Sequence, residues 1–282
     1  MKIAVVGLGL IGGSLCKAIK KRTSYTCLGL DTDAETCRMA LEQEAVDEII
    51  APAGLAAADV VFLCLHPRQT IEFLLAHLGD TRPGALLLDT CGVKGAVVDA
   101  VDRPVHEAGR LFVGCHPMAG REFSGFAYAV DDLFERASFI VTPTALTDPA
   151  ALEQAERLAM EIGFARTVRA APETHDRIIA FTSQLAHVAS SAYVKSPTIE
   201  RRAGFSAGSF LDLTRVARLN EDMWTDLFLY NRDALLAEVD TLIAHLGEYR
   251  DALKDNDADR LRALLRDGRE RKERSLDEQG GF

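Results

Sequence analysis

A glycine pattern near the start of the chain is the feature that most limits how it can fold. The segment Gly7-Leu8-Gly9-Leu10-Ile11-Gly12 follows an apolar run at 2–6 and opens an amphipathic stretch. In such a turn Gly7 allows the chain to reverse tightly, and Gly9 lets the backbone approach a pyrophosphate. Gly12 lets the helix pack closely against the strand. The whole segment therefore predicts a dinucleotide site at the amino end of a helix.

An acidic residue after the second apolar run supports this site. Asp31 follows the run 26–30 and lies about 20 residues beyond Gly12, the spacing expected for a carboxylate that binds the 2′-hydroxyl of the adenosine ribose. Its negative charge would repel the 2′-phosphate of NADP, and Asp33 adds to that charge. The residues therefore favour NAD as the cofactor over NADP. FAD, or a nucleotide sensor without catalysis, remains open on these residues alone.

The first part of the chain alternates apolar runs with amphipathic stretches. Strands are expected at 2–6, 26–30, 60–65, 85–89, 111–115, 138–142 and 164–168. Helices are expected at 11–22, 34–44, 69–78, 94–101 and 149–162. Near-continuous Val, Leu and Ile runs that are separated by helices are typical of a parallel sheet covered on both faces. Residues 1–170 are therefore predicted to form a doubly wound α/β domain of the Rossmann class.

The pattern changes from about Pro172 onward. Apolar residues recur every three or four positions through 174–195 and 222–253, which predicts two long helices. The stretch between them is expected to be a loop. The charged end, 266–282, is expected to be a solvated helix end followed by a frayed tail. Residues 171–282 are therefore predicted to form a second, all-α domain.

The composition excludes several classes of function. A net charge of −10 gives no electrostatic basis for binding nucleic acid or an anionic membrane. No apolar run approaches the roughly 20 residues of a spanning helix, and the N-terminus does not resemble a signal peptide, so we expect a cytoplasmic protein. The six cysteines contain no Cys-x-x-Cys pair and are expected to be reduced. No His or Cys cluster has the spacing of metal ligands, so no metal site is expected.

Three strand ends carry residues suited to a cofactor or a reaction, because ligands of a doubly wound sheet gather beyond the carboxyl ends of its strands. These ends read Leu65-His66-Pro67, Asp89-Thr90-Cys91-Gly92-Val93-Lys94 and Gly114-Cys115-His116-Pro117. The residues expected beside the cofactor are Leu65, His66, Asp89 and Cys91. A neutral His116 near the nicotinamide could accept the proton of a substrate hydroxyl while a hydride leaves the adjoining carbon. A purely structural role for this histidine is the alternative.

The helical half holds further polar candidates. Ser183 and His187 are four residues apart and share one face of the predicted helix at 174–195. Arg215 interrupts a segment of apolar and small residues, and its guanidinium would suit two-point binding of a carboxylate. A surface ion pair with Asp212 is the alternative for this arginine.

With these residues in place, the chain resembles the prephenate/arogenate dehydrogenases of tyrosine biosynthesis, over nearly its whole length. The most specific segment is Gly114-Cys-His116-Pro-Met-Ala-Gly120-Arg-Glu122-Phe-Ser124-Gly125. The other matching segments are Asp132-Leu-Phe134, Thr142-Pro143, Glu173-Thr-His175-Asp176, Thr182-Ser183-Gln184-Leu185-Ala186-His187, Gly204-Phe205, Thr214-Arg215, Asn220-x-x-Met223-Trp224 and Asn231. Few other Rossmann families combine these segments in this order.

The resemblance implies the oxidative decarboxylation of a cyclohexadiene that carries a ring hydroxyl and a ring carboxylate. His116 would bind the hydroxyl and assist hydride transfer to NAD, and the carboxylate would leave as CO2 because the ring becomes aromatic. Asp176 would be a second catalytic residue that orients neighbouring groups. The residues implied to bind the small-molecule substrate are Ser183, Gln184, His187 and Arg215. The arginine would hold a substrate carboxylate, and the helical domain would form a homodimer.

One position departs from the resemblance. Relatives often carry serine within an Asp-x-x-Ser-x-Lys pattern after the strand at 85–89, and here that pattern reads Asp89-Thr-Cys-Gly92-Val-Lys94. Gly92 has no hydroxyl, so Thr90, Cys91 or water would have to replace its contact with the substrate or the nicotinamide.

Two other functions compete with this interpretation. A Rossmann dehydrogenase of the β-hydroxyacid dehydrogenase or pyrroline carboxylate reductase type would share the glycine turn but not the segment around His116. A catalytically silent NAD-binding sensor would have no need for that histidine. The sequence does not distinguish prephenate from arogenate, which differ in a keto or amino group away from the reacting ring carbon.

Overall fold

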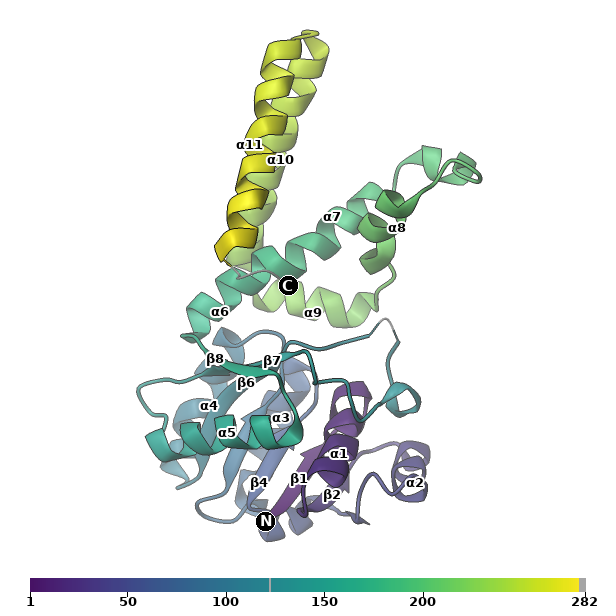
Figure 1. The fold of residues 1–282 in the computed structure, drawn as a ribbon. Helices are drawn as coiled ribbons and strands as arrows, with labels where there is room; N and C mark the ends of the chain where they lie inside the picture. Colours follow the sequence, from purple (N-terminus) through teal and green to yellow (C-terminus); the bar gives the residue numbers. More distant parts are fainter. Residues whose placement is uncertain (122, 279–282) are drawn as a thin grey trace. The chain divides into compact units, whose positions relative to one another are not determined.

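A single sheet organises the N-terminal part of the molecule (Figure 1). The computed structural model describes residues 1–121 and 123–278, and within them eight strands run in the order β3-β2-β1-β4-β5-β6-β7-β8. The strands are β1 (Lys2–Val6), β2 (Thr26–Leu30), β3 (Glu48–Ile49), β4 (Val60–Leu63), β5 (Leu86–Asp89), β6 (Leu111–Pro117), β7 (Ser138–Thr142) and β8 (Arg166–Arg169). The first six are parallel and follow the Rossmann order, which places the topological switch point between β1 and β4. The predicted doubly wound sheet is confirmed.

The last two strands break the predicted parallel arrangement, since β8 pairs parallel with β7. β7 pairs with β6 antiparallel, with His116 opposite Ile140. Parallel neighbours need a crossover connection, usually a helix. The described part of the link from β6 to β7 holds only a short 3-10 turn, η3 (Phe126–Tyr128), so the chain returns in the opposite direction. The short edge strand β3 was also not predicted.

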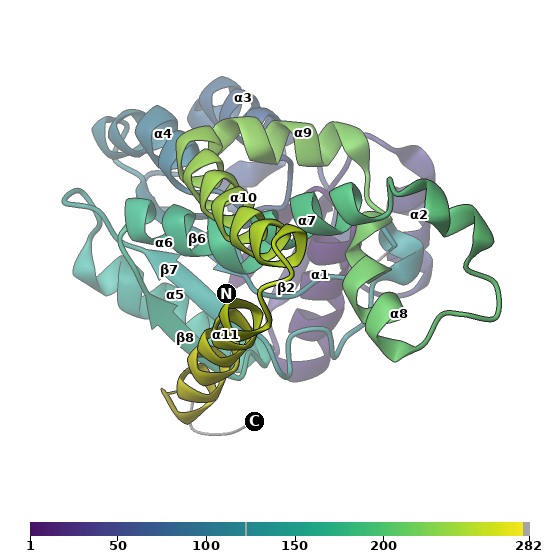
Figure 2. The ribbon, with the colours of Figure 1, turned by 90° about the horizontal axis from the view of Figure 1, so that it is seen from above.

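Helices cover both faces of the sheet. They are α1 (Leu10–Arg22), α2 (Ala34–Glu42), α3 (Pro67–His77), α4 (Gly95–Glu107) and α5 (Pro149–Ile162). Figure 2 shows α3 and α4 on one side of the strands and α1 and α5 on the other. Each side has its own buried core, with Leu15 and Leu158 in one and Leu74 and Val101 in the other. Burial of each large apolar side chain contributes about 1.5–3 kcal/mol, and these contributions together hold the layers in place.

The helical part differs from its prediction in three places, and the first is the stretch expected to be a loop, which holds a short α-helix at 208–214 and a 3-10 turn on either side of it. The helical part contains α6 (Pro172–Ile179), η4 (Ala180–Gln184), α7 (Leu185–Tyr193), η5 (Pro197–Arg201), α8 (Gly208–Thr214), η6 (Arg215–Ala217), α9 (Glu221–Tyr230), α10 (Arg232–Lys254) and α11 (Ala258–Glu278). The helix expected at 174–195 is interrupted by a π-turn at η4. The helix expected at 222–253 breaks at Asn231, whose backbone (φ −117°, ψ 29°) leaves the helical region.

The charged end, 266–282, was predicted to be a solvated helix end followed by a frayed tail. The helix end is confirmed, since α11 continues to Glu278. Ion pairs four residues apart, Asp267 with Arg271 and Arg269 with Glu273, stabilise its last turns. Residues 279–282 of that prediction lie outside the described residues.

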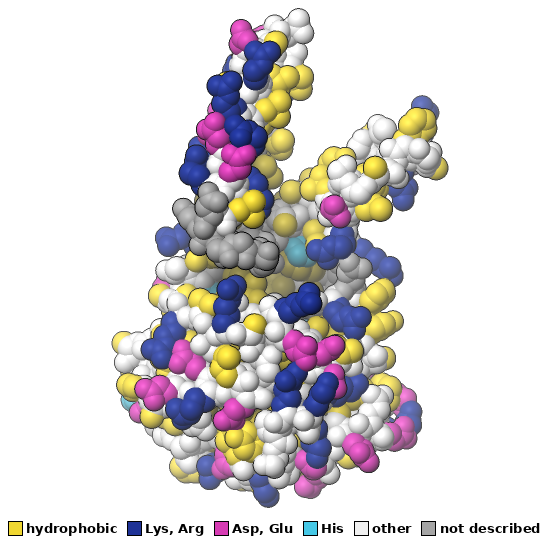
Figure 3. Space-filling model, viewed as in Figure 1, with side chains coloured by type: hydrophobic (Ala, Val, Ile, Leu, Met, Phe, Trp, Pro, Cys, Tyr) yellow, Lys and Arg dark blue, Asp and Glu magenta, His cyan; other side chains and the backbone are white. Residues whose placement is uncertain are grey.

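By its internal contacts the chain divides into two compact units, Met1–Arg232 and the part from Asp233 onward. In the second unit, apolar side chains of α10 are exposed at Leu236, Ile243, Leu246 and Leu253. Figure 3 shows hydrophobic and charged side chains next to one another along this α10–α11 hairpin. The domain boundary between residues 170 and 171 stays a prediction. Within the described residues, no helix has the length and apolar character needed to cross a membrane.

Candidate active site

The turn after β1 has the geometry expected of a nucleotide loop. Gly7 has a φ of +86°, and a Cβ there would lie 2.6 Å from the carbonyl oxygen of Cys64. A Cβ at Gly12 would lie 1.8 Å from the carbonyl oxygen of Gly7, so only glycine allows this approach of helix to strand. A Cβ at Gly9 would meet no atom within 4 Å, which leaves its backbone open to a ligand.

The amino end of α1 is suited to an anion. Gly9 caps the helix without a side-chain hydrogen bond, and no acidic residue lies in the first turn. Leu10 and Ile11, which open the helix, are half-buried. The free N–H groups of a first turn and the helix dipole favour a bound phosphate. These residues therefore fit the pyrophosphate of a dinucleotide.

Asp31 lies directly beside this turn. Its Oδ2 accepts a hydrogen bond of 2.7 Å from the backbone N–H of Leu8, and its Oδ1 accepts one of 2.9 Å from that of Asp33. These contacts hold the carboxylate at the carboxyl end of β2, next to the glycine turn. The position is the one expected for a ribose-binding acid.

The residues after β4 also reach the nucleotide turn. Leu65 packs against Gly7, since its Cδ2 would lie 2.8 Å from a Cβ built there. His66 is exposed and precedes α3. Both are therefore near the turn, as predicted from the strand ends, although their contact with a cofactor stays a prediction.

Cys91 is buried within the protein. Its thiol lies 3.3 Å from the hydroxyl of Thr70 and 3.6 Å from the carbonyl oxygen of Leu65, and burial raises its pKa. A buried neutral thiol behaves as a small apolar group. The predicted cofactor contact of Cys91 has no support in this geometry and remains only a prediction.

Asp89 forms a buried ion pair with Lys94, and both side chains are fully buried. The Lys94 ammonium also donates to the carbonyl oxygen of Cys115, and the backbone N–H of Cys115 donates to Asp89 Oδ1 at 3.0 Å. The pair thereby ties the end of β5 to the residue that precedes His116 on β6. A buried pair of this kind has its charges satisfied only within this geometry. Asp89 was predicted to bind the cofactor, and here its carboxylate bonds to protein groups.

His116 stands at the end of β6 in a chain of three polar side chains. Its Nδ1 lies 2.9 Å from Nε2 of His175, and the two rings meet at 66°. Nδ1 of His175 lies 2.7 Å from Oδ1 of Asp176. His175 and Asp176 belong to α6 and are buried. The contact joins a strand of the sheet to the first helix of the helical part.

Asp176 lies at the amino end of α4. Its Oδ1 accepts a hydrogen bond from the backbone N–H of Lys94, and its Oδ2 accepts one from that of Gly95, each at 2.8 Å. Burial opposes ionisation, but the hydrogen bonds from His175 and from these two N–H groups outweigh it and lower the pKa of Asp176. The carboxylate is therefore charged and fixed in orientation.

The two histidines are neutral. Burial lowers the pKa of His116 well below its usual range, and the nearby His175 and Lys94 lower it further. Burial also lowers the pKa of His175, although its hydrogen bond to Asp176 opposes that change. A neutral imidazole keeps one lone pair that can accept a proton.

Gln184 and Asn231 brace the site from the helical side. Asn231 Nδ2 donates to the carbonyl oxygen of Asp176 at 2.8 Å and to Gln184 Oε1 at 2.7 Å. Gln184 Nε2 donates in turn to the carbonyl oxygen of Leu227. Both side chains are buried, and Gln184 ends the π-turn. Turns of this kind are frequent at functional sites.

A second group of predicted residues gathers around His187. Its Nδ1 lies 3.0 Å from the carbonyl oxygen of Ser183, and its ring stacks on Trp224 with centroids 3.7 Å apart. Burial lowers the pKa of His187, and the positive charge of Arg215 lowers it further. The structure therefore brings His187 close to Arg215. The contact with Ser183 is through its backbone.

Four residues of the site were not predicted as site residues, namely Lys94, His175, Trp224 and Asn231. Trp224 and Asn231 contact His187 and Asp176, which lie far away in the sequence. Lys94 pairs with Asp89, five positions earlier, and the sequence showed both residues without showing that they pair. His175 meets a residue 59 positions earlier. The sequence signal that could have identified His175 was its position next to Asp176 near the start of a helix.

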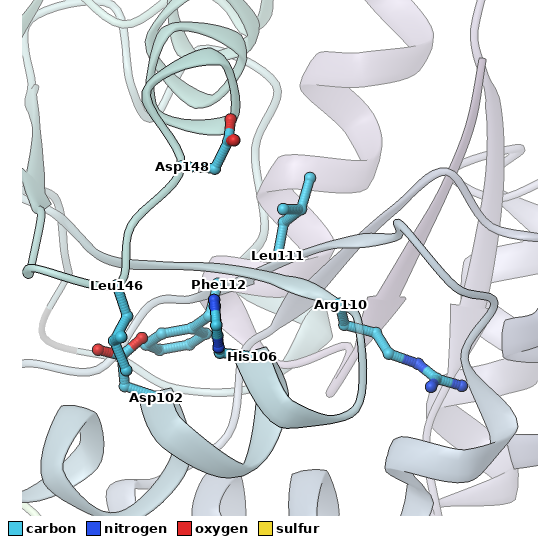
Figure 4. Close-up of a pocket in the computed structure, with 7 residues that line it drawn as sticks. All are labelled: Asp102, His106, Arg110, Leu111, Phe112, Leu146 and Asp148. Carbon is cyan, nitrogen blue, oxygen red and sulfur yellow. The ribbon is translucent and has the colours of Figure 1, made fainter.

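A pocket of about 170 Å³ lies elsewhere, at the amino end of β6 (Figure 4). It is lined by Asp102, His106, Arg110, Leu111, Phe112, Leu146 and Asp148. Ligands of a parallel sheet gather at the opposite, carboxyl end. We therefore place the site at the glycine turn and His116. Among the described residues no group of three or more His, Cys, Asp or Glu could hold a metal ion.

Comparison with known families covers most of the chain. Residues 15–168 match the family described as "Prephenate dehydrogenase, nucleotide-binding domain". Residues 171–267 match the one described as "Prephenate dehydrogenase, dimerization domain". The two matches together span both parts of the fold.

Individual relatives agree. The chain is 35% identical to the prephenate dehydrogenase of Bacillus subtilis (strain 168) over 272 residues, which is 92% of this chain and 72% of the relative. The Aquifex aeolicus prephenate dehydrogenase, solved with hydroxyphenyl propionate and NAD+, has a TM-score of 0.85 and 25% identity, covering 97% and 98% of the two chains. Synechocystis arogenate dehydrogenase has a TM-score of 0.81 and 28% identity, covering 98% and 100%. The resemblance found in the sequence is confirmed, and the chain belongs to the prephenate dehydrogenase family.

Proposed function

We propose that this protein catalyses the NAD-dependent oxidative decarboxylation of prephenate to 4-hydroxyphenylpyruvate, or of arogenate to tyrosine. The observation that carries the proposal is the position of His116. It stands at the carboxyl end of β6, on the same edge of the sheet as the glycine turn, in a chain of this family. Similarity to both a prephenate and an arogenate dehydrogenase leaves the two substrates as alternatives.

The cofactor proposal rests on the glycine turn and Asp31. Gly7, Gly9 and Gly12 would accept the pyrophosphate at the amino end of α1, and Asp31 would bind the adenosine ribose. The solved Aquifex aeolicus relative contains NAD+. When bound, NAD supplies the acceptor for a hydride from the substrate ring carbon.

His116 would act as the general base. Its neutral imidazole accepts the proton of the ring hydroxyl as that carbon becomes a carbonyl carbon. The bond from the ring to its carboxylate then breaks, CO2 leaves, and the bonding electrons complete the aromatic ring. The hydroxyl proton ends on His116 before it returns to solvent or product.

The helical part would bind the carboxylates of the substrate. Arg215 would pair with one of them, and His187, stacked on Trp224, would contribute a second contact. Ser183 and Gln184 would line the same region. Asp176 would act from a distance, because it reaches His116 through His175.

The protein would work as a homodimer in the cytoplasm. Residues 171–267 match a dimerization domain, and α10 exposes an apolar row formed by Leu236, Ile243, Leu246 and Leu253. Spacings of seven and three residues place this row on one face of the helix. A row of this kind is suited to cover by a second copy of the chain.

Steady-state assays test the proposal. The enzyme is offered prephenate and arogenate with NAD and with NADP, and nicotinamide reduction and CO2 release are followed together. We expect equal amounts of both products and a preference for NAD. A β-hydroxyacid serves as the control substrate. No nicotinamide reduction with either cyclohexadiene would overturn the proposal.

A further inference from the structure

We propose that His175, anchored by Asp176 at the amino end of α4, is a positioning residue that fixes His116 with Nδ1 protonated and Nε2 free. This inference rests on the proposed function for its catalytic meaning. The order of the hydrogen bonds along the three side chains carries it. Each donor and acceptor in that order follows from the one before.

The order begins at Asp176, because a carboxylate can only accept hydrogen bonds. Its two oxygens already accept the backbone N–H groups of Lys94 and Gly95, so the side chain cannot rotate freely. The nitrogen of His175 that faces it, Nδ1 at 2.7 Å, must therefore carry the hydrogen and donate. His175 thus has the Nδ1–H tautomer.

The second step passes this choice to His116. A neutral imidazole has one donor and one acceptor nitrogen, so Nε2 of His175 is an acceptor. It lies 2.9 Å from Nδ1 of His116, which must then donate. His116 therefore also has the Nδ1–H tautomer, and its Nε2 carries the lone pair.

A charged His175 would reverse the second bond, and its surroundings oppose that state. Its ring is fully buried, and the ammonium of Lys94 lies in the same network. Asp176 favours a positive His175, and Asp89 does so too, but Asp89 is already paired with Lys94. The neutral pair of histidines is the state that burial selects.

Nε2 of His116, which carries the lone pair, lies beside Gly92. A Cβ built on Gly92 would lie 3.8 Å from Nε2 of His116 and 3.6 Å from Leu227. Because Gly92 has no side chain, this residue does not cover Nε2, and the side chain of Leu227 borders the position that a Cβ would take. The proposed ring hydroxyl would donate to Nε2 on this side.

His116 needs such a partner because its strand fixes only its backbone. Pairing with Ile140 holds the main chain at this residue. The imidazole can still turn about its last side-chain bond, which has a broad energy profile. A half-turn of the ring about this bond would place Cδ2 where Nδ1 now lies and would move the lone pair of Nε2 to the other side of the ring. The contact with His175 prevents that exchange.

Three variants test the proposal by kinetics in the full-length protein. His175→Leu removes the acceptor for Nδ1 of His116, and His175→Gln keeps an amide oxygen that can accept from it. We expect His175→Leu to lower kcat roughly 10–100-fold, part of the about 10²–10⁴-fold that a general base contributes. KM for substrate and NAD should stay near the wild-type values, and His175→Gln should recover most of kcat.

The matched control is His77→Leu. His77 also pairs with an aspartate, Asp80, at 2.8 Å, but it lies at the end of α3 and is partly exposed. It should keep the wild-type kcat. Equal kcat for His175→Leu and wild type would overturn the proposal, as would a His175→Gln variant as slow as His175→Leu in spite of a native fold.

Nitrogen NMR of the wild-type protein tests the tautomers without any reaction. Histidine labelled with 15N distinguishes protonated from unprotonated ring nitrogens, and the His116→Asn and His175→Gln variants assign the signals. We expect Nδ1–H in both residues. Nε2–H in His116 would contradict the inference even if the enzyme is active, whereas an inactive enzyme with the expected tautomers would contradict only the proposed function.

Discussion

Oδ2 of Asp176 accepts a hydrogen bond of 2.8 Å from the backbone N–H of Gly95, which lies 81 residues earlier in the chain. The bond joins α6 to the first turn of α4, whose helix dipole favours a negative charge at that point. Asp176 therefore has two roles, one in holding α6 on the nucleotide-binding part and one in orienting His175.

Asp176→Asn should separate these two roles. Asparagine replaces one of the two carboxylate oxygens with an NH2 group. That NH2 group would face either the N–H of Gly95 or the N–H at Nδ1 of His175, so one of the two contacts becomes repulsive. We expect the free energy of unfolding to fall by about 1–3 kcal/mol, measured by chemical denaturation. We also expect kcat to fall, because a donor facing Nδ1 of His175 reverses both tautomers.

Asp148→Asn is the matched control for that variant. Asp148 caps α5 by accepting from the backbone N–H groups of Ala150 and Ala151, and asparagine is an equally good cap. Its stability and kcat should stay at the wild-type level. If Asp176→Asn behaves in the same way, the network assigned to Asp176 is wrong.

Stability should fall as the pH is lowered through the histidine range. The folded-state pKa values of His116 and His175 are lowered, so the folded protein binds fewer protons than the unfolded chain. The free energy of unfolding is therefore retained above a pH of about 6.5 and is lost progressively below it. Denaturation at a series of pH values should show this slope, and His175→Gln should reduce it.

His77→Gln provides the comparison for the pH series, since it removes an imidazole from a partly exposed position. An unchanged slope in His175→Gln would show that His175 does not titrate as its burial requires. The lowered pKa of His116 also predicts that kcat/KM is retained as the pH falls below about 6.5, the ordinary pKa of histidine. The reason is that the base stays unprotonated in this range.

Arg215→Ala should raise KM for the cyclohexadiene more than it lowers kcat. An ion pair with a substrate carboxylate exists already in the ground state, and its loss weakens ground state and transition state alike. Arg157→Ala, on the exposed face of α5, removes the same charge away from the site. A large loss of kcat at constant KM would place Arg215 in the chemical step instead.

Asp31→Asn should reduce the preference for NAD over NADP. The carboxylate would bond the 2′-hydroxyl of NAD and repel the 2′-phosphate of NADP, so its charge acts in opposite directions on the two cofactors. We expect the ratio of their kcat/KM values to fall roughly 10–100-fold, the size of one charged hydrogen bond. Asp148→Asn should leave the ratio unchanged, and an unchanged ratio in Asp31→Asn would remove Asp31 from cofactor selection.

Much of the nucleotide-binding part could be predicted because its signals are local. The glycines of the turn and Asp31 act through backbone conformation and through strand ends that a parallel sheet always brings together. The direction of β7 could not be predicted, because it depends on the link from β6, whose described residues, 118–121 and 123–137, hold no crossover helix. Apolar periodicity alone is the same for parallel and antiparallel strands.

The positioning part of the site was harder to predict. Asn231 sits in a sequence that is helical by pattern, and its buried hydrogen bonds to Asp176 and Gln184 appear only in the folded chain. His175 meets His116 across 59 residues for the same reason. Residue types and spacing named His116 and Arg215 as candidates, whereas the partners that orient them are set by tertiary packing.

The kcat of His116→Asn with NAD and a cyclohexadiene substrate tests the account most directly. Asparagine keeps a polar side chain at the end of β6 but cannot accept the hydroxyl proton. We predict a kcat lowered by about 10²–10⁴-fold with unchanged NAD binding, measured by steady-state turnover and by calorimetric titration of the cofactor. Turnover near the wild-type rate would show that His116 is not the base and would contradict the mechanism.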